Sequence, residues 1–303
     1  MATNIYWPIF KSIEHETINL SYNIHMDDNQ LNVYSAKIMD LILRAAAEIE
    51  SISKELYKLN GGTKTGEIKY DNDALVHLNN IWLIDKKEVI ISHPNCFQTT
   101  KVILPFVKNE TRTGKTYLTY SWNNAYQNLK HDRANSLHFG SVKYLFDILA
   151  ALYILNIYYK NEKINLGLDN TGVSFHTNAG SDLFAIILSK EKDGLLDGTY
   201  RKNIDFDKAV YFVKMTDDAI QEEEKGREGV NQQYSDFLLA EPKIKKYLED
   251  NGKTIDDLDM KLASDILGEE ENSKILKRCT KIFEFGQLLS KFQYEAVLNK
   301  NQV

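Results

Sequence analysis

A long apolar helix pattern constrains the fold of this chain more than any other feature. Val142, Leu145, Leu149 and Leu152 recur at three- and four-residue steps, the spacing of side chains on one face of a helix. The pattern belongs to the stretch from Trp122 to Tyr159, which reads as two helical runs. A second amphipathic helix is predicted over residues 32–59 from its own apolar stripe. The chain is therefore predicted to be mainly helical.

Polar side chains continue the apolar stripe toward the N-terminus. Followed backwards, it meets His138, Asn135 and His131, which would place imidazole and amide groups on a buried helix face. A buried polar group without a partner costs about 1–3 kcal/mol, so these residues are expected to have a partner or a function. Arg133 lies five residues before His138 and completes an Arg-x4-His pattern. Lys130 adds a further positive charge.

The segment where the two helical runs meet resembles the HEPN superfamily, helical domains with an Arg-x4–6-His motif near the start of the last long helix. The residues that carry the resemblance are Trp122, Asn128, Lys130, His131, Arg133 and His138. It is most specific over residues 120–160, extends to 31–60, and is absent beyond about 165. It implies a HEPN-like helical bundle and a metal-independent ribonuclease of bacterial toxin or antiviral systems. It also implies a homodimer in which both motifs line one cleft, and a possible antitoxin or defence partner.

Under this resemblance Arg133 and His138 are the catalytic pair. A histidine accepts or donates a proton near neutral pH, as attack by the RNA 2′-hydroxyl on its phosphate requires. An arginine stays charged and stabilises the phosphate oxygens in the transition state. The expected products are a 2′,3′-cyclic phosphate and a 5′-hydroxyl, with no metal or cofactor. Ala134 departs from the family's usual polar residue after the arginine, which puts activity in doubt.

Geometry qualifies this assignment. Five residues along one helix place two side chains about 140° apart, so Arg133 and His138 share a site only if the helix breaks between them. Asn135 would share the face of His138 and orient its ring or touch a phosphate. His131 is expected to orient substrate or cap the preceding helix, Lys130 to contact phosphate or solvent, and Glu48 to position Arg133 or, more simply, to pair with Arg44.

A purely structural interpretation remains open. His138 would then be a core histidine bonded to a backbone carbonyl, and Arg133 would pair with Asp132 or Glu48. The chain would be a catalytically silent helical module that binds RNA or protein, or a scaffold of a defence complex.

Composition sets limits on these alternatives. The net charge of −6 argues mildly against a protein that coats duplex nucleic acid, whereas a small nuclease site needs only local positive charge. Cys96 and Cys279 form no metal-ligand or disulfide pattern. The N-terminus shows no secretory signal, and the apolar run at 144–159 is interrupted by Asp147 and Asn156 and is too short for a membrane span. A cytoplasmic location is expected.

Three regions are predicted along the chain. Residues 1–30 form an N-terminal arm or short strand, and 31–160 form the helical domain, with a small β insertion over about 61–120. Residues 161–303 form an α+β region that binds an unknown partner or ligand. Within these regions short strands are predicted at 88–92, 101–104, 183–188 and 209–215, with a Gly-containing connection between the last two, and helices at 73–83, 231–252, 256–268 and 271–298.

Overall fold

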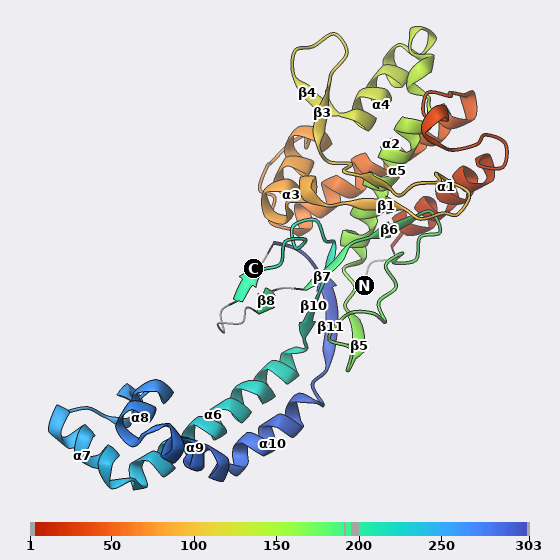
Figure 1. Ribbon diagram of the computed structural model, residues 1–303. Helices are drawn as coiled ribbons and strands as arrows, with labels where there is room; N and C mark the ends of the chain where they lie inside the picture. The colour runs from red at the N-terminus through yellow and green to blue at the C-terminus, as the bar shows by residue number, and fades with distance from the viewer. Residues whose placement is uncertain (1–3, 191, 195–199, 302–303) are drawn as a thin grey trace. The chain divides into compact units, whose positions relative to one another are not determined.

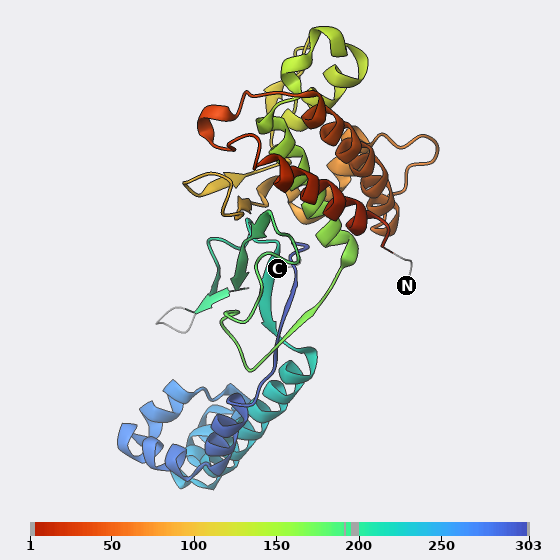
Figure 2. The ribbon, with the colours of Figure 1, turned by 90° about the vertical axis from the view of Figure 1, so that its right-hand side faces the viewer.

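The computed structural model describes residues 4–190, 192–194 and 200–301 (Figures 1 and 2). It divides into two units. The first contains the chain up to residue 164, residues 171–214 and the chain from 296 on; the second contains residues 165–170 and 215–295. The α-helices of the first unit are α1 (Tyr6–Leu20), α2 (Ala36–Leu59), α3 (Leu75–Trp82), α4 (Ser121–His131) and α5 (Val142–Lys160). A π-helical turn at Tyr70–Ala74 leads into α3.

Helix α5 is the core of the first unit. Most of its side chains are buried, and it packs against α1, α2 and α4 (Figure 1). Its length and composition would suit a membrane span, but 78% of the apolar window is buried inside the protein, as in the core helix of a folded domain. Helix α2 begins at the capping hydroxyl of Ser35 and ends before Gly61, close to the predicted bounds. The mainly helical fold is confirmed.

The start of α5 differs from the prediction. The backbone N–H groups of Val142 and Lys143 donate to the carbonyls of Val33 and Leu31 at 3.0 Å each. The free N–H groups of a helix's first turn need such outside acceptors, and the segment before α2 supplies them. The helix therefore begins at Val142, and His138 does not lie on its buried face.

Small sheets complete the first unit. Strands β1 (Val89–Ile91), β2 (Lys101–Ile103) and β6 (Phe184–Ile186) form an antiparallel sheet in the order β2-β1-β6, with Ile90 opposite Val102 and Ala185. The predicted β insertion thus pairs with a strand nearly one hundred residues later and is not a separate body. The remaining strands are β3 (Lys108–Thr111), β4 (Leu118–Tyr120), β5 (Ile164–Gly167), β7 (Leu188–Lys190), β8 (Lys192–Gly194), β9 (Tyr200–Lys202), β10 (Tyr211–Met215) and β11 (Tyr294–Leu298).

The strand order of one further sheet was not expected from the sequence. Strands β5, β11, β10 and β7 form a sheet in that order, and β10 pairs with β7 in parallel. Residues 294–298 are therefore a strand, whereas a helix was predicted to extend to 298, because backbone pairing overrides the local helical pattern. The Gly-containing connection predicted between the strands at 183–188 and 209–215 includes residues 191 and 195–199, which lie outside the described residues.

The N-terminal residues differ from the expected arm or strand. Residues 6–20 form helix α1, which buries Tyr6, Phe10, Ile13 and Thr17 at helical spacing. Pro8 falls in the first turn, where its missing N–H removes no helical hydrogen bond. The division into units also differs from the predicted boundary after residue 160, because residues 171–214 belong with the bundle.

The second unit is helical. Its elements are α6 (Asp217–Ala240), α7 (Pro242–Asn251), α8 (Met260–Leu267), α9 (Glu269–Arg278) and α10 (Thr280–Leu289). Leu238, Ile244, Ala263 and Ile275 are buried together in a small core of its own. Helical structure is confirmed over most of the predicted segments 231–252, 256–268 and 271–298. The first and the last of these are each divided into two helices, and the last ends in the strand β11.

One buried lysine makes the stability of the first unit dependent on pH. Lys87 is fully buried and donates to the carbonyl of Asp207 at 2.9 Å, and burial lowers its pKa to about 8. Between pH 8 and about 10.4 the unfolded chain holds a proton that the folded chain has lost. Stability therefore rises with pH across this window.

We expect Lys87→Met to stabilise the protein at pH 7 by about 2 kcal/mol. Removing the buried charge gains about 3 kcal/mol, and leaving the Asp207 carbonyl unbonded costs about 1 kcal/mol. The variant should also lose the rise in stability between pH 8 and 9.5. Urea unfolding at pH 7, 8 and 9.5 tests this; an unchanged or lower midpoint for the variant at pH 7 would contradict it. Above pH 10 both proteins should weaken, because burial raises the pKa of Tyr153 and Tyr158.

Candidate active site

The predicted site residues other than Glu48 lie in one exposed segment of the first unit, between residues 130 and 138. Helix α4 ends at His131, and the chain reaches α5 through two short 3-10 turns, Arg133–Asn135 and Leu137–Phe139. The side chains of five predicted residues in and before these turns are all exposed: Lys130, His131, Arg133, Asn135 and His138. Arg133 and His138 therefore both lie between the two α-helices, so the angular separation expected along one continuous helix does not apply to them.

Buried residues fix this connection to the bundle. Ser136, Phe139 and Gly140 are buried, and the Ser35 backbone N–H donates to the Gly140 carbonyl at 3.2 Å. A Cβ atom at position 140 would lie 2.0 Å from Cγ of Met39, so only glycine allows this close approach. These buried residues and the hydrogen bond to Ser35 therefore fix the position of the exposed turns on the helical bundle.

Arg133 and His138 are not structural core residues. Within the described chain Arg133 has no carboxylate at ion-pair distance, so the expected pairs with Asp132 and Glu48 are not formed. The His138 ring packs on Phe139, with ring centroids 4.3 Å apart, and its side chain stays exposed. The interpretation of His138 as a buried, carbonyl-bonded histidine is wrong, because the residue precedes the helix that would have buried it.

The neighbouring polar residues have local partners. Asn135 donates to the Asp132 carboxylate at 2.8 Å rather than to His138, so its expected contact with the imidazole is not formed. Lys130 donates to the Tyr126 hydroxyl at 3.0 Å, and this hydrogen bond raises the pKa of the ammonium group. His131 is the last residue of α4. Among the described residues its ring makes no hydrogen bond to a carbonyl of that helix, so its capping role stays a prediction.

Glu48 lies apart from the motif. It is half-buried on α2, and burial raises the pKa of its carboxyl group, partly opposed by the positive charge of Arg44. No ion pair joins it to Arg133 in the described residues. The expected Arg44–Glu48 pair is also replaced, because Arg44 bonds the Glu16 carboxylate of α1 at 2.6 Å. Only the packing of α1 on α2 makes Glu16 available.

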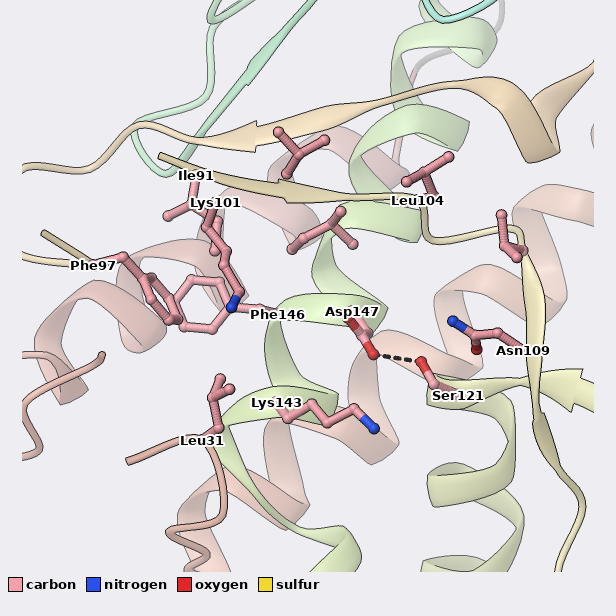
Figure 3. Close-up of a pocket in the computed structure, with 13 residues that line it drawn as sticks. Leu31, Ile91, Phe97, Lys101, Leu104, Asn109, Ser121, Lys143, Phe146 and Asp147 are labelled. Atoms are coloured by element: carbon pink, nitrogen blue, oxygen red, sulfur yellow. Dashed lines mark hydrogen bonds between the residues drawn. The ribbon is translucent and has the colours of Figure 1, made fainter. Parts of the chain in front are cut away.

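Sequence reasoning missed a cavity of about 350 Å³ beside α5 (Figure 3). The Asp147 carboxylate lies in it and accepts a hydrogen bond from the Ser121 hydroxyl. Lys101 of β2 and Lys143 of α5 also line it. The only sequence signal was one charged residue inside an otherwise apolar helix. The described residues contain no group of three or more His, Cys, Asp or Glu side chains placed to hold a metal ion.

Comparisons with protein-family models, with curated proteins and with solved structures find no match to this chain.

Proposed function

We propose that this chain is a metal-independent endoribonuclease on a HEPN-like bundle, with Arg133 and His138 as its catalytic pair. The main observation in support is that both side chains are exposed, on consecutive 3-10 turns of the segment that joins α4 to α5. The guanidinium group also has no carboxylate partner among the described residues. A cation held at the surface without a counterion is available to a phosphate.

The bundle supports the same proposal. Helices α2, α4 and α5 pack against one another, and the Arg-x4-His segment lies directly before the last of them. The resemblance implies a motif near the start of the last long helix of the domain, and here the motif lies in the turns that lead into α5.

The chemistry follows from the residue types. Cleavage by the 2′-hydroxyl needs a base that removes its proton and an acid that protonates the leaving 5′-oxygen. One chain offers a single His138, and a two-fold homodimer brings a second imidazole to the same cleft. Arg133 binds the phosphate oxygens as negative charge develops in the transition state. The atoms balance as a 2′,3′-cyclic phosphate and a 5′-hydroxyl.

The proposed setting is bacterial antiviral defence or a toxin–antitoxin system, in the cytoplasm, with an antitoxin or defence protein as partner. This part of the proposal rests on the resemblance of the motif segment alone, since fold and motif do not define a biological role.

Incubation of the purified protein with RNA in excess EDTA tests the activity. We expect strand cleavage with 2′,3′-cyclic phosphate and 5′-hydroxyl ends, identified by mass spectrometry of the fragments. The same RNA with a 2′-deoxy sugar at the cleaved position should stay intact, because the nucleophile is missing. Cleavage that stops in EDTA, or that leaves 5′-phosphate ends, would refute the mechanism. RNA binding without any cleavage would support the silent module instead.

A further inference from the structure

The cavity beside α5 combines apolar walls with a half-buried carboxylate acceptor. Its walls include the rings of Phe97 and Phe146, whose centroids lie 5.3 Å apart in an edge-to-face pair. Asp147 points into the space from α5, and its carboxylate is joined to Ser121 in Figure 3. A cavity with aromatic walls and few convergent polar groups is the usual form of a small-ligand site.

The carboxylate is costly to the fold at this place. Burial raises the pKa of Asp147, while Ser121 and the two lysines oppose that rise. Among the described residues only Oδ2 receives a hydrogen bond, from Ser121, and no protein donor reaches Oδ1. Asp147 is half-buried, so Oδ1 is open to a ligand in the cavity that supplies N–H groups.

Positive charge flanks this acceptor. The Lys101 ammonium group lies 5.6 Å from the centre of the Phe97 ring and pairs with the exposed Asp28, and Lys143 pairs with Glu110 at 3.4 Å. Both lysines are partly exposed, so their long side chains can turn toward an anion. The cavity therefore offers an aromatic surface, an acceptor for N–H donors and two cations within one space.

We propose that this cavity binds a guanine nucleotide, with the edge of the base on Asp147 and the phosphate at Lys101 and Lys143. Among the four common bases, guanine offers two adjacent donors, N1–H and the 2-amino group, to one carboxylate. Adenine and cytosine instead present a donor beside an acceptor. Bases taken out of a stack are commonly held on aromatic side chains. The guanine is either a free nucleotide or one unstacked residue of an RNA strand.

This inference goes beyond ribonuclease activity and does not depend on it. Equilibrium binding by the full-length protein tests it, with GMP, AMP and xanthosine 5′-monophosphate, and with RNA pentamers that differ only in one central G or A. We expect GMP to bind about tenfold or more tightly than AMP. Binding of the G-containing pentamer without binding of free GMP would identify an RNA strand as the source. The proposal would be overturned if GMP bound no more tightly than AMP and the G-containing pentamer no more tightly than the A-containing one. It would also be overturned if neither GMP nor the G-containing pentamer bound at millimolar concentration.

Asp147→Asn provides the sharper test. The amide presents one acceptor and one donor, which match N1–H and the second carbonyl of xanthine. The variant should therefore lose GMP affinity about tenfold or more and gain affinity for xanthosine 5′-monophosphate. Such a gain cannot come from misfolding. Unchanged GMP affinity in this variant would contradict the assignment of Asp147.

Three further variants complete the experiment. Asp40→Asn removes an exposed carboxylate on α2 outside the cavity and should bind GMP as the unmodified protein does. Leu104→Trp fills the cavity from a partly exposed position and should abolish binding of all nucleotides tested. His138→Ala should bind GMP normally, so loss of cleavage and loss of nucleotide binding are separable. Normal GMP binding by Leu104→Trp would show that the ligand lies elsewhere.

Discussion

Replacing His138 with alanine should lower the rate of RNA cleavage about 10²–10⁴-fold without unfolding the protein. The imidazole is exposed and packs on the Phe139 ring, so its removal leaves no buried cavity and no unpaired buried group. The loss should therefore appear in the cleavage rate and not in the unfolding midpoint. Cleavage of a labelled RNA in EDTA, measured beside urea unfolding, separates the two effects.

Matched variants make this result specific. His176→Ala removes another exposed histidine, far along the sequence, and should cleave RNA at the unmodified rate. Arg133→Lys keeps the charge but loses the planar fork of donors, so an intermediate loss is expected. If His138→Ala cleaves as fast as the unmodified protein, the catalytic assignment fails and the chain is better described as a binding module.

Replacing Glu14 with leucine should destabilise the first unit by about 3–5 kcal/mol. The Glu14 side chain is 1% exposed. One of its oxygens, Oε1, accepts from the Ser181 hydroxyl and from the backbone N–H groups of Asp182 at 3.0 Å and Leu183 at 3.1 Å. The other bonds Lys11. Leucine would remove the acceptor of the buried Ser181 hydroxyl and of the Asp182 N–H, and would leave the Leu183 N–H with the Ser181 hydroxyl oxygen alone. The desolvation cost of these donors is the source of the loss.

Tryptophan fluorescence during urea unfolding measures this effect, because Trp7, Trp82 and Trp122 all belong to the first unit. Glu14→Gln keeps an acceptor oxygen and should lose less stability than Glu14→Leu. Glu16→Ala, two residues along the same helix, removes a partly exposed ion pair and should cost no more than about 1 kcal/mol. If the urea midpoint of Glu14→Leu equals that of Glu16→Ala within experimental error, the Glu14 carboxylate does not stabilise the first unit through these hydrogen bonds.

The candidate site could be located from the sequence, but its conformation could not. The Arg-x4-His spacing indicated residues 130–138, and the structure brings Arg133 and His138 into one exposed connection. The same pattern wrongly continued the apolar helix back through His138. Side-chain periodicity cannot reveal that the carbonyls of Leu31 and Val33 bond the first amides of α5, because those acceptors are more than one hundred residues away in the chain.

Local side-chain patterns were enough to predict the apolar stripe of α5, the stripe of α2 and its glycine end, and the short β-branched strands β1 and β2. Tertiary structure decided the rest. It made a strand of residues 294–298, joined Glu14 to the turn at 181–183, and placed Asp147 beside Ser121. The physical reason is that hydrogen-bond partners and burial come from residues distant in the chain, whereas periodicity records only which face of an element is apolar.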